Sequence, residues 1–192
     1  MMKKLTALTL LLLILAAPAL AESPLLDQLA HLREHRLLSA VCDVLDAEEL
    51  SYELDEEYNG CFLSVALSTP SVLGEDAYLA LYAYEDGVSI MAIYAECTPP
   101  AHRSELIRLC NHLSGAVYLG KFYVDPYNND LCYELFIPVD ALNIRDFDHK
   151  LIADSLWTAV GTLDFYQEYF LMIVSDGETA DNVFAMWEAD MY

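Results

Sequence analysis

The feature that most constrains the fold is a run of alternating side chains between Cys61 and Glu96. Apolar residues recur at every second position from Cys61 onward, a period typical of half-buried β-strands. Two more apolar runs, 78–84 and 88–94, flank Asp86-Gly87, the dipeptide typical of a type I′ hairpin. Three antiparallel strands are therefore predicted, and the alternation requires that one face of their sheet be covered.

A second hairpin is predicted further along the chain. Its strands are 117–124 and 131–138, on either side of the turn-forming segment 125–130. Two strands of this length complete a sheet large enough to need helices on one side.

Helical periodicity marks the remaining segments. A helix over 25–50 is expected to be broken or bent near His35-Arg36, because its apolar stripe changes sides there at about 100° per residue. A short helix is predicted around Leu106–Leu113, with Thr98 as its N-cap, Pro99-Pro100 in its first turn and Gly115 as its stop. A long helix runs from Asp148 towards Gly177, and 179–190 forms a short terminal helix.

These elements define the fold class. The order α-βββ-α-ββ-α predicts an α+β domain with an antiparallel sheet that helices cover on one face. Residues 22–192 are expected to form this single domain, with 178–192 as a C-terminal helical extension.

The N-terminus predicts export. Lys3 and Lys4 precede an apolar run that ends at Ala19-Leu20-Ala21, the pattern of a signal peptide over residues 1–21. The run is shorter than the roughly 20 residues that span a bilayer. A periplasmic or secreted protein beginning at Glu22 is therefore predicted, with no membrane attachment after cleavage.

The charge of the chain excludes classes of partner. The formal net charge is −22, and cleavage would remove two lysines and no acid, giving −24. Such a surface repels phosphate backbones and anionic lipids, so nucleic acid is excluded as a partner. A protein partner of unknown identity is expected, and a homodimer is also allowed.

Five cysteines follow the signal peptide, and no C-x-x-C pair occurs among them. Export permits disulfides, but the odd number leaves one thiol free. At most two bridges are expected, and their pairing stays open among Cys42, Cys61, Cys97, Cys110 and Cys132.

One motif suggests an enzyme. His31-Leu32-Arg33-Glu34-His35 matches H-x-x-E-H, in which two histidines bind zinc and the glutamate activates water. The motif crosses the expected helix break, whereas catalytic zinc needs a rigid helix and a third ligand. An extracytoplasmic zinc hydrolase using His31 and His35 is kept as an alternative, while the main prediction contains no metal, cofactor or catalytic residue.

Tyrosines suggest a different role. Seven of them fall in predicted strands, and a tyrosine-rich sheet face left uncovered by helices would suit protein binding. These residues are Tyr78, Tyr82, Tyr84, Tyr94, Tyr118, Tyr123 and Tyr133.

Three segments together resemble the YbjN-domain family. They are Leu106–Asn111, Gly120–Asp125 and Leu131–Pro138, a helix followed by the two strands of a hairpin, and the resemblance extends over about 25–174. It implies a fold similar to type III secretion chaperones and a non-enzymatic role in regulation or protein interaction. Within these segments the interaction surface is expected at Asn111, Lys121, Tyr123 and Tyr133. A structural envelope protein or an inhibitor is the remaining alternative.

Overall fold

The computed structural model describes residues 24–55, 57–71, 74–94, 98–139 and 148–191. Its centre is a six-stranded antiparallel sheet with the strand order β1-β2-β3-β4-β6-β5. The strands are β1 (Glu53–Asp55), β2 (Gly60–Ser71), β3 (Gly74–Tyr84), β4 (Gly87–Tyr94), β5 (Lys121–Val124) and β6 (Leu131–Pro138). The described helices are α2 (Pro24–Ala47), α3 (Arg103–Ala116), α4 (His149–Asp176) and α5 (Ala180–Met191). The α+β class is confirmed, and β1 is an additional strand.

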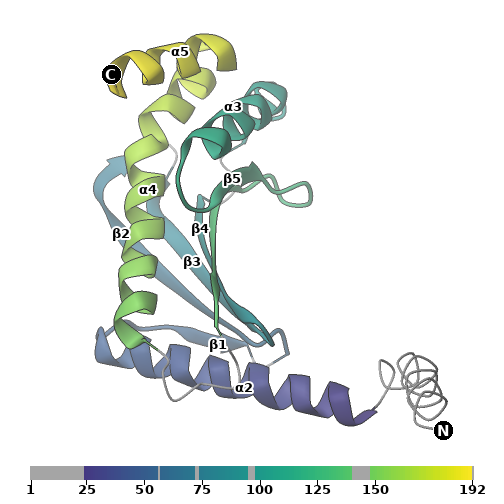
Figure 1. Cartoon of the computed structure of the whole chain (residues 1–192). Coiled ribbons are helices and arrows are strands. Elements are labelled where there is room, and N and C mark those ends of the chain that lie inside the picture. The colour runs from purple at the N-terminus through teal and green to yellow at the C-terminus, as the bar shows by residue number, and fades with distance from the viewer. Residues whose placement is uncertain (1–23, 56, 72–73, 95–97, 140–147, 192) are drawn as a thin grey trace, which may run out of the picture.

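The described helices lie on one side of the sheet (Figure 1). Helix α4 packs on β4 and β6, and α2 packs on β3 at one end of the sheet. The strand side chains that face the helices form one core with buried residues of α2, α3 and α4, which include Leu45, Leu109, Leu156 and Phe170. The prediction of a sheet covered on one face is therefore confirmed.

Helix α2 is continuous, so the predicted break near His35-Arg36 is wrong. The two halves of the helix differ in their surroundings. Leu29 and Leu32 are exposed, whereas Leu38 and Leu45 are buried in the core. The change of apolar stripe thus marks the point where α2 reaches the sheet, and the helix axis needs no bend there.

Helix α3 begins later than predicted, at Arg103, and its N-cap is His102. It also continues past Gly115, which is helical, and ends at Ala116. Near its end Ser114 reaches the outer edge of β5: its Oγ accepts a hydrogen bond from the Phe122 N–H at 2.7 Å and donates one to the Phe122 carbonyl at 3.1 Å. This side chain satisfies backbone groups that an edge strand would otherwise leave open.

Helix α4 has the predicted limits. Asp148 is its N-cap and accepts a hydrogen bond from the Leu151 N–H, and Gly177 ends it with a φ of 71°. Gly177 suits this position because the left-handed region costs glycine little.

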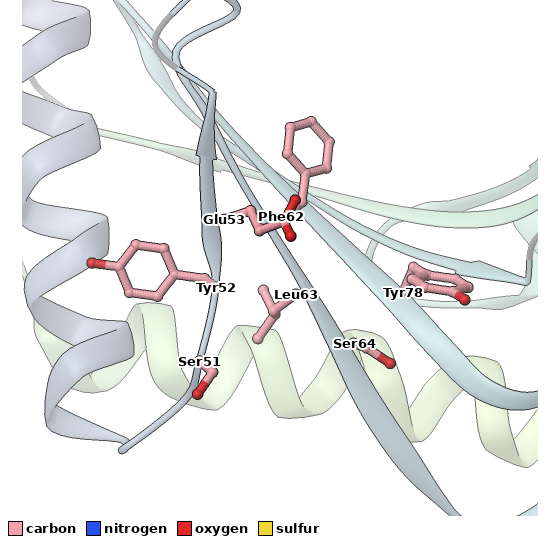
Figure 2. A pocket seen from close by; sticks show the side chains of 7 residues that line it. All are labelled: Ser51, Tyr52, Glu53, Phe62, Leu63, Ser64 and Tyr78. Atoms are coloured by element: carbon pink, nitrogen blue, oxygen red, sulfur yellow. The ribbon is translucent and has the colours of Figure 1, made fainter.

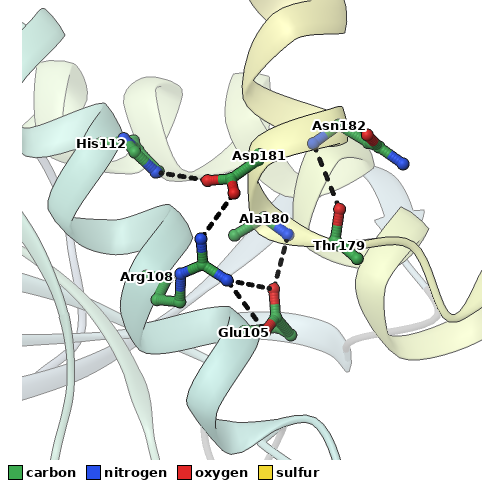
Figure 3. A network of polar contacts seen from close by, with 7 residues as sticks. All are labelled: Glu105, Arg108, His112, Thr179, Ala180, Asp181 and Asn182. Atoms are coloured by element: carbon green, nitrogen blue, oxygen red, sulfur yellow. Dashed lines mark hydrogen bonds and ion pairs between the residues drawn. The ribbon is translucent and has the colours of Figure 1, made fainter.

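Helix α5 is held against α3 by a polar network (Figure 3). Arg108 donates hydrogen bonds to Asp181 at 2.6 Å and to Glu105 at 3.3 Å. Glu105 also accepts the Ala180 N–H at 2.8 Å, at the first residue of α5, and His112 lies 3.1 Å from Asp181. Below this network, Val183 and Trp187 of α5 are buried in the core.

The β3–β4 hairpin is present, but its turn differs from the prediction. Tyr84 pairs with Gly87, so Glu85 and Asp86 form the turn, and neither has a positive φ. Gly87 is needed for space, because a Cβ there would lie 2.4 Å from the Ile137 carbonyl oxygen. None of the helices in the described residues is both long and apolar enough to cross a membrane.

Candidate functional site

The side of the sheet that faces away from the helices carries a set of large apolar side chains. We call this the open face. Its register follows from the strand pairs, which place Phe62, Tyr82 and Met91 on one side and the core residues between them on the other. No described helix packs on it. The large apolar members of the open face are Phe62, Tyr78, Tyr82, Tyr84, Met91, Ile93, Tyr123 and Phe136.

Several of these rings are half-exposed: Tyr78 is 48% exposed, Tyr84 46% and Phe136 48%. In a soluble domain such side chains usually occur singly. Here Tyr78 and Tyr84 lie on β3 and Phe136 lies on β6, and Met91 and Ile93 of β4 lie between these two strands on the same face. The open face therefore carries apolar side chains from β3, β4 and β6, together with the polar side chains of Ser89 and Glu134.

Two glycines leave room for aromatic rings close to the backbone of the open face. A Cβ on Gly60 would come within 3.0 Å of the Tyr82 ring, and one on Gly87 within 2.5 Å of the Phe136 ring. The rings cover the bare backbone at these points and are held against the sheet. Because they are already fixed, a partner that binds them orders few side chains.

A polar chain crosses the open face from β4 to β5. Ser89 donates a hydrogen bond to Glu134 at 2.8 Å, and the other carboxylate oxygen of Glu134 lies 2.9 Å from Lys121 Nζ. Lys121 Nζ also lies 5.4 Å from the centroid of the Tyr123 ring, a cation–π contact. The Tyr123 hydroxyl donates to the Met91 sulfur at 3.1 Å. The lysine charge is thus balanced within the face.

Three tyrosines of the open face, Tyr82, Tyr84 and Tyr123, have a raised pKa. Burial raises the pKa of both Tyr82 and Tyr84, and the negative charge of Glu134 raises the pKa of Tyr84 further. Burial likewise raises the pKa of Tyr123, with Cys132 and Glu134 adding to the effect. Phenol hydroxyls that keep their protons can donate hydrogen bonds to a bound carbonyl.

A pocket of about 370 Å³ lies where the open face meets the edge of the sheet (Figure 2). Strand β1 pairs only with Gly60, Cys61 and Phe62, so the pocket opens where β1 begins, at Glu53 beside Phe62. Figure 2 shows Phe62 and Leu63 pointing to opposite sides of β2, as their burial requires. The lining residues are Ser51, Tyr52, Glu53, Phe62, Leu63, Ser64 and Tyr78.

The four predicted interaction residues do not lie together in the structure. Lys121 and Tyr123 lie together on the open face. Tyr133 does not lie on the predicted interaction surface: it is 2% exposed and packs against Phe122 in the core. Glu134, the next residue of β6, is on the open face, so Tyr133 points to the opposite side of the sheet. Its hydroxyl donates to the Leu119 carbonyl. Asn111 is exposed on α3 and is not part of the sheet.

The seven tyrosines that were predicted to lie in strands also occupy different places. Tyr78, Tyr82, Tyr84 and Tyr123 are on the open face, whereas Tyr94 is buried in the core like Tyr133. Tyr118 lies before β5 and is fully exposed. The sequence reasoning missed Phe62 and Phe136, although their two-residue spacing from Ser64 and Glu134 marks the same face.

The H-x-x-E-H segment lies on the exposed half of α2. His31 Nδ1 is 3.9 Å from Glu34, and the His31 and His35 rings lie 6.5 Å apart between centroids. Asn59 donates a hydrogen bond to the same Glu34 carboxylate oxygen, at 3.1 Å. The described residues contain no group of three His, Cys, Asp or Glu side chains placed to hold a metal ion.

Comparisons with known proteins bear on the fold. No family model matches the chain, and no curated protein matches it in sequence. Among solved structures, the crystal structure of YbjN from E. coli matches with a TM-score of 0.50 and 12% sequence identity. The match covers 68% of this chain and 87% of the YbjN chain. A likeness at this identity concerns the fold and leaves activity and partners open. The chain therefore has a YbjN-like α+β fold.

Proposed function

We propose that this protein is an exported, non-enzymatic module that binds a segment of another protein on the open face of its sheet. The observation that carries the proposal is the set of half-exposed aromatic rings on the open face, Tyr78, Tyr84 and Phe136, with their apolar neighbours. Exposed apolar patches of this kind mark interaction sites, and tyrosine is enriched at the centres of protein interfaces. The residues of the open face are held by strands, so they present a preformed surface.

The edge of the sheet favours an extended partner. On the β5 edge, the N–H and the carbonyl of Phe122 are already hydrogen-bonded to Ser114 Oγ. On the opposite edge, β1 pairs with β2 only as far as Phe62, and no other described strand continues this pairing. An extended segment that enters the pocket at Ser64 and Tyr78 would meet backbone donors and acceptors of β2 and the rings of the open face together.

Charge defines the chemistry of this segment. The chain carries −22, and Glu53 and Asp55 of β1 lie on the same side as Phe62, at the margin of the open face. At the β5 edge of the face, Lys121 is already paired with Glu134. The proposed partner segment therefore has apolar side chains at its centre and lysine or arginine beside them.

The structural neighbour supports a regulatory role. YbjN is described as a candidate transcription regulator, and that description names no reaction. For the present chain we propose that any regulation acts through protein contact, because a net charge of −22 repels the phosphate backbone of DNA.

Export forms the second part of the proposal and rests on the N-terminal sequence. Lys3, Lys4, the apolar run and Ala19-Leu20-Ala21 favour cleavage before Glu22. N-terminal sequencing of the protein isolated from its host is expected to begin at Glu22. Protein that retains Met1 in the cytoplasmic fraction would overturn this part and leave the binding surface untouched.

The binding proposal is tested by quantitative capture from an envelope extract. The open-face variant replaces Tyr78, Tyr84 and Phe136 with alanine. The matched control replaces three exposed residues on helices, Leu32, Leu151 and Phe165, with alanine. We expect a protein captured by the wild-type chain and by the control to be lost at least about tenfold with the open-face variant, as for interface anchors.

Circular dichroism establishes that both variants are folded before capture is compared. Equal capture of every bound protein by the two variants would contradict binding on the open face.

A further inference from the structure

Cys42 and Cys61 lie against each other at the junction of α2 with the sheet. Their sulfur atoms are 3.5 Å apart, although 18 residues separate them along the chain. Cys42 comes from the buried half of α2, and Cys61 is the second residue of β2, on its helix-facing side. A disulfide needs about 2.05 Å between sulfurs, so roughly 1.5 Å of approach, within the range of a side-chain rotation, would join them.

The two thiols differ in access. Cys61 is completely buried, whereas Cys42 is partly exposed and lines a groove of about 490 Å³ between α2 and β1. The other lining residues are His35, Arg36, Leu38, Ser39, Tyr52 and Leu54. A reagent in solution therefore reaches Cys42 first.

Arg36 brings a positive charge to this groove, and the carboxylate of Asp46 lies close to Tyr52. The chain as a whole has a net charge of −22. A carboxylate-bearing disulfide such as glutathione disulfide could pair with the Arg36 guanidinium in the groove that Cys42 also lines. Tyr52 also touches Cys42 closely enough that the sulfur raises the pKa of the tyrosine hydroxyl.

We propose that Cys42 and Cys61 are a redox-active pair that forms a disulfide between α2 and β2. The bond forms by exchange with a small or protein disulfide, and Cys42 is the thiol that reacts with this donor first. The inference does not depend on the proposed partner. It assigns one pairing among the five cysteines of the chain.

The exchange proceeds in two steps. The Cys42 thiolate attacks one sulfur of the donor disulfide, which breaks the donor S–S bond and releases the first donor thiolate. The Cys61 thiol then loses its proton and attacks the Cys42 sulfur, which forms the internal bond and releases the second donor thiolate. The protein loses two electrons and two protons, and the donor is reduced to two thiols.

Burial makes the second step the slower one. It raises the pKa of the Cys61 thiol, and the adjacent Cys42 sulfur raises it further. Only a thiolate attacks, so the mixed disulfide on Cys42 persists until Cys61 is deprotonated.

Mass spectrometry of the whole chain tests the pairing. Purified protein is reduced, incubated with glutathione disulfide and alkylated at its remaining thiols. Cleavage after glutamate places Cys42, Cys61 and Cys97 on separate peptides, 35–48, 58–75 and 97–105. We expect peptides 35–48 and 58–75 to be joined with the loss of two hydrogens. A bridge to Cys97, Cys110 or Cys132 instead, or alkylation of both Cys42 and Cys61, would overturn the proposal.

Single variants test the order of attack. Cys61→Ser should hold a stable glutathione adduct on Cys42, whereas Cys42→Ser should leave Cys61 unmodified because it is buried. Cys132→Ser is the matched control and should still form the bridge. An adduct on Cys61 in Cys42→Ser, with none on Cys42 in Cys61→Ser, would contradict Cys42 as the entry site.

The thermal midpoint gives an independent readout on the wild-type chain. A bridge that closes a loop of about 20 residues should raise the midpoint of the oxidised over the reduced protein by roughly 5–10 °C. Cys42→Ser should show no such difference. Equal midpoints for oxidised and reduced wild-type protein would mean that no bridge joins α2 to β2.

Discussion

Lys121 and Glu134 lie directly opposite each other on β5 and β6, with 2.9 Å between Nζ and Oε2. One residue along each strand, Phe122 and Tyr133 form the next pair on the other side of the sheet, and their ring centroids are 4.7 Å apart. The first pair is on the open face and the second is in the core. A step of one residue therefore separates the proposed binding surface from the residues that stabilise the fold.

This arrangement predicts that substitutions on the open face and in the core differ in their effect on the free energy of unfolding. Lys121→Ala should lower the free energy of unfolding by less than about 1 kcal/mol, because the Lys121 side chain is 61% exposed and its ion pair is screened by solvent on that side. Leu109→Ala and Leu156→Ala should each cost about 2–5 kcal/mol, because both side chains are completely buried. Urea denaturation measures all three, and a Lys121 variant that is the least stable would contradict the placement of the sheet faces.

Gly120 is predicted to tolerate no side chain. Its φ is 74°, and a Cβ would lie 2.6 Å from the Glu134 carbonyl oxygen, so Gly120→Ala should cost roughly 2–4 kcal/mol. Gly161→Ala is the matched control. Gly161 is in α4 with nothing within 4 Å of the added Cβ, so this change should stabilise by about 0.5–1 kcal/mol. Equal denaturant midpoints for the two variants would contradict the β5 geometry.

Contact between α3 and α5 should weaken in acid. Hydrogen bonds from Arg108 and then His112 hold the pKa of Asp181 below its usual 3.8. A lowered folded-state pKa means that the stabilisation is complete above the unfolded value and is lost as pH falls through the folded one. In urea denaturation at pH 5, the wild-type protein should have a larger free energy of unfolding than Asp181→Asn. The difference between the two free energies should narrow below pH 3.8. A difference that grows in acid would contradict the network.

The zinc alternative has its own test. His31→Ala and His35→Ala should change the free energy of unfolding by under about 0.5 kcal/mol, because both side chains are exposed on α2. Metal analysis of the purified chain is expected to show no stoichiometric zinc. Stoichiometric zinc in the wild type that disappears in both variants would favour a hydrolase.

Much of the fold could be predicted where local signals and tertiary packing agree. The limits of α4 followed from Asp148 and Gly177, and the second hairpin followed from the turn residues between Val124 and Leu131. β1 could not be predicted, because Glu53-Leu54-Asp55 is short, acidic and largely exposed. It is a strand only through its pairing with β2, which no local pattern encodes.

The site was partly predictable for the same reason. Tyrosine alternation in β3 indicated a surface of tyrosines, and Lys121 and Tyr123 were placed on it. Tyr133 was misplaced because Leu131-Cys132-Tyr133 is apolar at three successive positions and gives no alternation. Its face is decided by its pairing with Phe122. The Cys42–Cys61 contact joins a helix to a strand, so their spacing alone could not identify it.

Site-specific photocrosslinking shows whether the open face contacts another protein in the cell. A benzoylphenylalanine residue is placed at Tyr78, Tyr84 or Phe136 on the open face, or at the exposed helix positions Leu151 or Phe165 as controls. Irradiation of host cells is expected to give an adduct with one defined protein from the open-face positions and not from the controls. Adducts from the control positions alone, or from the open face only with a second copy of this chain, would contradict the account.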